Sequence, residues 1–306
     1  MDVSDFTRDE FAEVMDAAEK MREVLERPIR RVPTLRGTTI ANVFYEPSTR
    51  TRVSFELAGK NLSADVVNVS ASGSSVEKGE SLIDTFQTIQ ALGADLVVIR
   101  HSCAGAPELA SRHLTCGVIN AGDGARGHPT QALLDLYTVR RRLGDLEGLK
   151  VVIVGDVLHS RVARSDIWAF ARMGAQVVLS GPPPLVPANL AGITDGVGEV
   201  SIVHEFDEAI RDADVVMALR VQRERMQAGL LPDLREYARR WSITQARLER
   251  AERNALVMHP GPMNQGIEIS PEVAYSDQSV IEEQVANGVA VRMAVLYLLM
   301  SGASQR

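Results

Sequence analysis

The chain has 306 residues and a formal net charge of −7, with 45% hydrophobic and 24% charged residues. This length allows two ordinary domains with substantial cores, and the composition is that of a globular protein. The negative charge argues against a broad nucleic-acid surface, although it leaves room for a local basic pocket.

Sequence signals for export or membrane insertion are weak. The N-terminus, MDVSDFTRDE (1–10), is acidic and lacks the apolar core of a signal peptide. The longest late apolar run, AVLYLLM (294–300), is far shorter than the ~20 residues that a bilayer requires. Cys103 and Cys116 fit neither a disulfide framework nor a C-x-x-C pair. We therefore expect a cytoplasmic protein without membrane contact.

The first half of the chain alternates between helix and strand periods. Residues 7–27 show helical spacing and end before Pro28. Short strand-like runs follow, each succeeded by a helical pattern: TTIANVF (38–44), ADVVNVS (64–70), ADLVVIR (94–100) and GVINAG (117–122). An amphipathic segment at 128–144 leads into the turn-rich GDLEGLK (144–150). Strands that alternate with helices predict βαβ units around a parallel sheet.

The same rhythm restarts in the second half. Its strand-like runs are KVVIVGDV (150–157), AQVVLSGP (175–182), ADVVMALR (213–220) and ALVMH (255–259), and a helical tail follows at 282–301. The predicted fold class is therefore α/β with two domains, each a parallel β-sheet flanked by helices. We expect the first domain to span 1–144, completed by the C-terminal helix 282–306, and the second to span 145–281.

The stretch EPSTRTRVSFE (46–56) predicts a helix that starts with misplaced charges. Ser48 is a good N-cap, yet Arg50 and Arg52 fall in the first turn, at the positive end of the helix dipole. First-turn N–H groups, hydroxyls and a guanidinium together form an anion site that suits phosphate. The alternative is that these arginines pair with Glu46 and Glu56, the latter at i,i+4 from Arg52.

A second motif, GDGARG (122–127), matches the dinucleotide fingerprint G-x-G-x-x-G but occurs in the wrong context. It follows the fourth predicted strand instead of the first, and His128-Pro129 comes directly after it. The strand at 150–157 is followed by His159-Ser160-Arg161 without such glycine spacing. The sequence therefore does not favour a nicotinamide cofactor.

Four motifs together resemble the transcarbamoylase family: STRTR (48–52), HPTQ (128–131), RVQ (220–222) and HPGP (259–262). They occur in the family's order and spacing, and the resemblance covers the whole chain. HPGP and RVQRER (220–225) look like the aspartate type, because ornithine-type relatives carry His-Cys-Leu-Pro in the last loop. Two departures are Gln265, where several aspartate-type relatives have arginine, and Ser102, which replaces a common proline.

The resemblance implies a carbamoyltransferase that joins carbamoyl phosphate to L-aspartate in pyrimidine biosynthesis, with no metal and no organic cofactor. In the family, residues matching Ser48, Thr49, Arg50 and Thr51 hold the phosphate, in a first domain that binds carbamoyl phosphate. Arg100 would bridge the phosphate and the carbonyl oxygen, which Thr51 and His128 would also contact. A simple capping role is the alternative for His128.

The resemblance also assigns the carbamoyl NH₂ group and the second substrate. Gln131 and the backbone carbonyls of Pro260 and Gly261 would contact the NH₂ group, and we expect a cis Gly261–Pro262 bond to aim those carbonyls. The aspartate carboxylates would be bound by Arg161, Arg220 and Gln222. A surface salt bridge for Arg161 and a solvated strand end for Arg220 are the alternatives. Two arginines suit a dicarboxylate better than the terminal ammonium of ornithine.

The loop SASGSSVEKGES (70–81) is longer than a strand-to-helix connection requires. It is either a flexible surface loop or, as in the family, a segment that reaches the neighbouring subunit of a trimer. In the second case Ser74 and Lys78 would complete an active site shared between chains. The residues leave open whether regulatory chains or a dihydroorotase join the trimer. A transcarbamoylase for another amine such as ornithine, and a non-catalytic carbamoyl-phosphate-binding scaffold, are the alternative functions.

Overall fold

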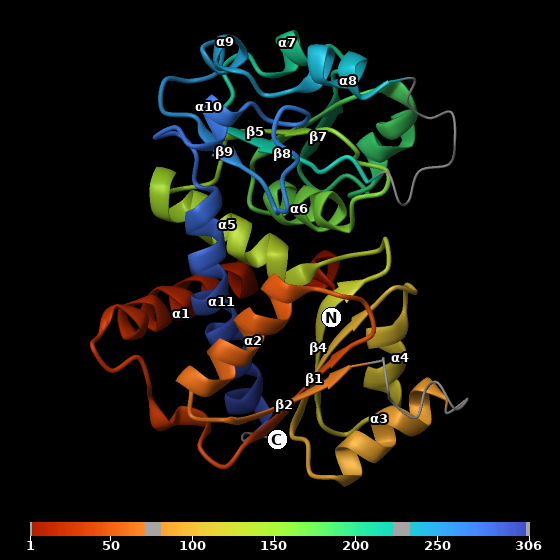
Figure 1. Cartoon of the computed structure of the whole chain (residues 1–306), viewed down its shortest axis with the longest axis vertical. Coiled ribbons are helices and arrows are strands. Elements are labelled where there is room, and N and C mark those ends of the chain that lie inside the picture. Colours follow the sequence, from red (N-terminus) through yellow and green to blue (C-terminus); the bar gives the residue numbers. More distant parts are fainter. Residues whose placement is uncertain (1, 71–80, 223–232, 304–306) are drawn as a thin grey trace. The chain divides into compact units, whose positions relative to one another are not determined.

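The computed structural model describes residues 2–70, 81–222 and 233–303. The chain divides into two compact units (Figure 1), Met1–Leu134 with Val285–Arg306 and Asp135–Gln284. The division falls within two helices, α5 (Pro129–Leu143) and α11 (Ile281–Ala303). The boundaries expected from the sequence lie after residues 144 and 281. Each unit is described separately below.

The first unit is built on a parallel sheet whose strands the sequence predicts. Its strands are β1 (Thr39–Phe44), β2 (Asp65–Ser70), β3 (Leu96–His101) and β4 (Gly117–Asp123). Their order in the sheet is β2-β1-β3-β4, and each neighbouring pair is parallel. Because β1 and β3 are neighbours, the helices that follow these two strands leave from one edge of the sheet on opposite sides.

Helices cover both faces of this sheet (Figure 1). They are α1 (Arg8–Glu26), α2 (Thr49–Asn61), α3 (Leu82–Ala91), α4 (Ala106–His113) and the larger part of α11, with short 3₁₀ helices at Val3–Asp5 and Pro33–Leu35. Phe86 of α3 and Ala110 of α4 pack on Val43 and Val97. On the opposite face, Gly59 of α2 approaches β2 so closely that an added Cβ would lie 2.6 Å from Val66.

The second unit holds a second parallel sheet of the order β7-β6-β5-β8-β9. Its strands are β5 (Lys150–Val154), β6 (Gln176–Ser180), β7 (Glu199–Ile202), β8 (Val215–Ala218) and β9 (Leu256–Met258). The sequence predicts four of them and misses β7. That strand has four residues, lies at the edge of the sheet and is half exposed, so it lacks the continuous apolar run of its neighbours.

Short helices surround the second sheet (Figure 1). They are α6 (Arg161–Arg172), α7 (Phe206–Ala209), α8 (Leu234–Trp241), α9 (Gln245–Leu248) and α10 (Pro271–Ala274), with 3₁₀ helices at Pro183–Leu185 and Ala188–Gly192. Phe206, Tyr237 and Trp241 pack with Val152 and Val216 in one buried cluster. This cluster fixes one face of the sheet, and α6 covers the other.

Helix α11 is long and apolar enough, by length and composition, to cross a membrane, with a mean hydropathy of 1.5 over Ile281–Gly302. Core helices of globular proteins meet the same test, and 44% of this helix's most apolar window is buried inside the protein. Ala290, Val291, Ala294 and Leu296 are fully buried side chains of this helix. The apolar character of α11 is thus accounted for in part by its packing in the core of the first unit.

Helix α11 also fixes α2 through a buried arginine. Arg292 is 4% exposed, and its Nη1 donates to Ser54 Oγ and to the carbonyl oxygen of Gly288, both at 3.0 Å. Its guanidinium carbon lies 5.2 Å from the centre of the Phe55 ring. Gly288 makes room for this group, since an added Cβ would lie 2.5 Å from Arg292 Nη1.

Replacing Gly288 by Ala tests this anchor. The methyl group would displace the Arg292 guanidinium and leave buried polar groups without their hydrogen bonds, at about 1–3 kcal/mol, more than the ~1 kcal/mol gained in helix propensity. We expect Gly288→Ala to lower the free energy of unfolding in a denaturant titration. Gly302→Ala, where no atom lies within 4 Å of the added Cβ, is the matched control and should be neutral or slightly stabilising. Equal stability of the two variants would contradict the anchor.

Candidate functional site

The start of α2 has the geometry of an anion site. Ser48 occupies the N-cap position with extended backbone (φ −159°), as predicted, but its side chain makes no capping hydrogen bond. The first turn contains no acidic residue. Thr49 and Arg50 are exposed, whereas Thr51 is buried against the unit. First-turn N–H groups that no cap side chain satisfies, with a cation beside them, suit a bound oxyanion.

The acidic residues nearby are engaged with other partners. Glu56 pairs with Lys60 Nζ at 2.6 Å and accepts from Asn68 Nδ2 at 3.0 Å. The hydrogen bond with Lys60, followed by that with Asn68, lowers the pKa of Glu56. The charge of Arg52 makes the smallest contribution to this shift. Glu46 contacts Arg100 at 3.3 Å. The alternative in which Glu56 neutralises Arg52 by a direct pair is therefore not what the structure forms.

Arg100 and His128, which the resemblance assigns to the same carbonyl oxygen, lie close together in the first unit. Arg100, at the end of β3, is 9% exposed and contacts Glu46 Oε1 at 3.3 Å and the carbonyl oxygen of Ala121 at 3.3 Å. Its Nη1 lies 3.5 Å from His128 Nε2. Because a guanidinium can only donate, this contact assigns Nε2 as the acceptor and Nδ1–H as the donor of the imidazole.

The GDGARG stretch forms a tight turn that leads to His128. Gly124 has φ +51°, and an added Cβ would lie 2.6 Å from the backbone nitrogen of Ala104, so glycine is required here. Asp123 Oδ1 accepts from the backbone N–H of Gly105 at 2.7 Å. Helix α5 begins at Pro129, after the last glycine. His128 is thereby buried at the start of α5, and Gln131 follows in the first turn with 9% exposure.

Sheet order explains why these segments converge. β1, β3 and β4 are neighbours, and their carboxyl ends lead to the start of α2, to Arg100 and to His128. The chain leaves β1 and β3 in opposite directions, which makes the point between them a topological switch point. Ligands of open α/β sheets bind at such points.

In the second unit, the predicted cations stand at the corresponding place. Arg161 is the first residue of α6, which follows β5, and is 5% exposed. Arg220 and Gln222 follow β8, the neighbour of β5 on the other side of the switch point. Asp156 links the segments that follow β5 and β8. Its carboxylate accepts from His159 Nδ1 at 2.8 Å and from the backbone N–H of Gln222 at 3.3 Å. Sequence reasoning did not single out Asp156.

The HPGP segment follows β9, the next strand of the same sheet. The Gly261–Pro262 bond is cis, as predicted, and His259 Nδ1 accepts from the backbone N–H of Gly261 at 2.8 Å. The sequence also missed Glu268, a buried carboxylate that joins two predicted segments. It accepts from the backbone N–H groups of Val221 and Asn264, both at 2.9 Å. Burial raises the pKa of Glu268, although these donors counteract the shift.

Some predicted residues are not placed by these contacts. Ser74 and Lys78 lie outside the described residues, as does the end of RVQRER. Of the two departures from the family pattern, Gln265 is exposed and donates through Nε2 to the Tyr275 hydroxyl at 2.7 Å, and Ser102 is exposed.

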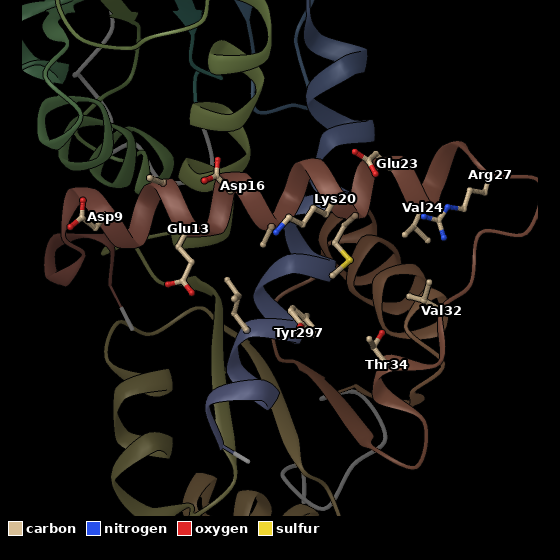
Figure 2. Close-up of a pocket in the computed structure, with 14 residues that line it drawn as sticks. Asp9, Glu13, Asp16, Lys20, Glu23, Val24, Arg27, Val32, Thr34 and Tyr297 are labelled. Carbon is tan, nitrogen blue, oxygen red and sulfur yellow. The ribbon is translucent and has the colours of Figure 1, made fainter. Parts of the chain in front are cut away.

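A cavity of about 730 Å³ lies elsewhere in the first unit, along α1 and α11 (Figure 2). Asp9, Glu13, Asp16 and Lys20 of α1 line it, with Tyr297 of α11. Its lining includes none of the predicted site residues, and its charges are mixed in sign. This groove is therefore separate from the strand-end site.

Both units match models of one known protein family. The carbamoyl-P binding domain of the aspartate/ornithine carbamoyltransferase family matches residues 1–141, and the Asp/Orn binding domain of that family matches residues 147–299. The chain is 63% identical to the aspartate carbamoyltransferase catalytic subunit of Roseiflexus castenholzii over 300 residues, which cover 98% of this chain and 94% of that protein.

Solved structures show the same fold. Aspartate transcarbamoylase from Trypanosoma cruzi, in complex with carbamoyl phosphate and aspartate, superposes with a TM-score of 0.89 at 30% identity, covering 97% of this chain and 95% of that one. Ornithine carbamoyltransferase from Pyrococcus furiosus gives 0.88 at 29% identity, covering 98% and 96%. The fold thus does not by itself choose the amine. The two family matches and the sequence identity establish that this chain belongs to the aspartate/ornithine carbamoyltransferase family.

Proposed function

We propose that this chain transfers the carbamoyl group of carbamoyl phosphate to the α-amino group of L-aspartate, giving N-carbamoyl-L-aspartate and phosphate, a step of de novo pyrimidine biosynthesis. The observation that carries the proposal is the pairing of buried Arg100 with His128 at the switch point beside the α2 anion site. The 63% identical Roseiflexus castenholzii protein, named as an aspartate carbamoyltransferase catalytic subunit, supports it independently.

The α2 start would hold the phosphate of the donor. Ser48, Thr49 and Thr51 supply hydroxyls and first-turn N–H groups, and Arg50 supplies a guanidinium at an exposed position. A doubly negative group at this place converts the unfavourable cations of the first turn into favourable ones. Binding here would also orient the carbamoyl carbon toward Arg100 and His128.

Catalysis would rest on stabilising charge that develops on the carbamoyl oxygen. The aspartate amine attacks the carbamoyl carbon, and the oxygen becomes an oxyanion while the new C–N bond forms. Thr51, Arg100 and the Nδ1–H of His128 would donate to it, and a single such donor contributes about 3–4 kcal/mol to the transition state. The C–O bond to phosphate then breaks, and the leaving phosphate takes the amine proton.

The carbamoyl NH₂ group needs acceptors, which the chain offers in two places. Gln131 presents a side-chain amide oxygen one turn into α5, and Pro260 and Gly261 present backbone carbonyls. These groups would hold the carbamoyl plane while the amine attacks. The proposed steps involve protein groups and the two substrates, without a metal or an organic cofactor.

Charge favours aspartate as the acceptor. Arg161, Arg220 and Gln222 stand at neighbouring strand ends of the second unit, and two cations match two carboxylates. The terminal ammonium of ornithine would be repelled by the same pair. A non-catalytic scaffold would need only the phosphate site, and the arginines at the strand ends of the second unit would then have no ligand.

A substrate comparison tests the proposed function. Purified protein with carbamoyl phosphate should release phosphate rapidly with aspartate and at least 100-fold more slowly with ornithine, since placing an ammonium beside two arginines costs several kcal/mol. Phosphate release measured with each amine gives the ratio. A preference for ornithine would identify the other amine type, and binding of carbamoyl phosphate without release under either condition would identify a scaffold.

Replacing Arg50 by Gln tests the anion site. N-(phosphonacetyl)-L-aspartic acid, which the Trypanosoma cruzi enzyme binds, should bind Arg50→Gln about 10–150-fold more weakly by calorimetry, because one charge-assisted hydrogen bond is lost. Arg52→Gln is the control, since this arginine lies two residues further on the helix, about 200° away around its axis. Equal weakening by both substitutions, or by neither, would contradict a specific role for Arg50.

We propose further that the chain acts as a homotrimer with shared active sites, in the cytoplasm. An exposed apolar patch supports a subunit contact beside the anion site: Val53 and Leu57 lie on one face of α2, and Val67 lies on the edge strand β2, each 42–50% exposed. Apolar side chains grouped around a sheet edge are typical of a covered surface. Ser74 and Lys78 follow β2 in the chain and would reach the neighbouring subunit.

Mixed trimers test the shared site. Lys78→Ala and Arg161→Ala chains should each be inactive alone, because each lacks one part of every site. Hybrids reassembled from equal amounts should recover about a quarter of wild-type activity. In a cyclic trimer each site needs one chain with intact Arg161 and a neighbour with intact Lys78, and each condition is met in about half of the cases. Native mass spectrometry reports the assembly. Hybrid trimers that form but stay inactive would show that each site lies within one chain.

A further inference from the structure

The second unit contains a pair of buried carboxyl groups to which the steps above assign no task. Asp135 lies on α5 and Asp166 on α6, and both are fully buried. Asp135 stands one helical turn after Gln131, so the two share a face of α5. Buried acidic residues are rare unless they are paired or hydrogen-bonded, so this pair needs a physical explanation.

The carboxyl group of Asp135 is the immediate neighbour of the Asp166 carboxyl group in the interior. Within the described residues, no N–H or O–H donor of another side chain or backbone group reaches either oxygen of Asp166. A hydrogen bond between two carboxyls requires one proton, because two carboxylates are both acceptors. Burial, followed by the charge of Asp135, raises the pKa of Asp166 well above its usual value.

Three charged groups on the neighbouring helices have contacts of their own. Glu283 of α11 pairs with Arg142 of α5 at 2.6 Å. On α6, Arg164 Nη2 donates to the carbonyl oxygen of Leu158, and Arg172 lies over the Trp168 ring. Asp135 is the charged neighbour that acts on the pKa of Asp166.

A relay of buried hydrogen bonds leads from this pair to the HPGP segment. Gln284 Nε2 donates to Asp135 Oδ1 at 2.7 Å, and Gln284 Oε1 accepts from the backbone N–H of His259 at 2.9 Å. His259 Nδ1 in turn accepts from the backbone N–H of Gly261. Gln284 is 2% exposed and His259 is 1% exposed. A carboxylate at Asp135 fixes the orientation of the Gln284 amide, because the Nε2 end must face it.

We propose that Asp135 and Asp166 hold one proton between them and, through Gln284, position the 259–262 segment whose carbonyls orient the carbamoyl group. They are positioning residues, since they act through Gln284 and His259 and not on the substrate. The inference rests on the proposed function for its kinetic consequence. The shared proton and the relay themselves are properties of the second unit.

Asp166→Asn separates the proton from the hydrogen bond. The Asn amide can still donate to Asp135, so the relay persists, but residue 166 no longer titrates. A carboxyl whose pKa is raised by folding contributes stability that is complete below its unfolded pKa near 4 and is lost as pH rises through the folded pKa. The unfolding equilibrium constants of wild type and Asp166→Asn should therefore diverge up to about tenfold per pH unit above pH ~4, with wild type losing stability. Parallel pH profiles would overturn the shared proton.

Gln284→Met tests the relay with a side chain of similar size. Loss of both amide contacts should lower kcat/KM for carbamoyl phosphate about 10–100-fold in a protein that still unfolds cooperatively. The control is Gln278→Met, which removes amide contacts to the carbonyl oxygens of Ala255 and Arg253 in the same unit and should leave kcat/KM unchanged. Asp166→Asn should retain activity and extend it to higher pH, whereas Asp166→Ala should resemble Gln284→Met.

The outcomes distinguish this inference from the proposed function. Wild type is assayed first with carbamoyl phosphate and aspartate, and no transfer at all would refute the function. The pH profiles of unfolding still decide whether the pair holds a proton in that case. An active wild type with unchanged kinetics in folded Gln284→Met would refute the positioning role.

Discussion

The constraint on which the site depends is the charge at the start of α2. Cations in the first turn of a helix oppose its dipole by about 0.3–1 kcal/mol each. Glu56, at i,i+4 from Arg52, pairs with Lys60, and Glu46 contacts Arg100. Arg292 of α11 meanwhile holds the inner face of α2 in place. An oxyanion bound at the first-turn N–H groups offsets this unfavourable charge.

Sheet topology decides which side chains accompany this helix start. Each unit has a switch point, between β1 and β3 in the first and between β5 and β8 in the second. The predicted residues that the structure describes follow the carboxyl ends of strands at these points or of the next strand in the sheet, although their motifs lie far apart in the chain. The division of chemistry follows from the same order. The first unit gathers a phosphate site with Arg100 and His128, and the second gathers the cations for a dicarboxylate.

The sequence predicts those features that repeat or have a local signature. Apolar runs identify eight of the nine described strands, and the short half-exposed β7 lacks such a run. The Pro-Gly-Pro spacing predicts the cis Gly261–Pro262 bond, which the structure confirms. Asp156, Glu268 and Gln284 escape detection because their roles come from tertiary contacts. From the sequence alone, a polar residue in a loop or on a helix is expected to face solvent. Its burial depends on contacts with distant segments, such as the hydrogen bond from the backbone N–H of Val221 to Glu268.

Buried polar groups in both units share one energetic logic. Removing a charged group from water costs several kcal/mol unless hydrogen bonds or a partner compensate. Three such groups nevertheless lie in the interior: Arg100, Glu268 and the pair of Asp135 with Asp166. Arg100 donates to the carbonyl oxygen of Ala121, Glu268 accepts from the backbone N–H of Val221, and Asp135 accepts from Gln284. Such hydrogen bonds make the interior more rigid, while they add little to the net free energy of folding. The fold therefore holds its donors and acceptors in place before substrate arrives, so that little reorganisation remains when the carbamoyl oxygen acquires its charge.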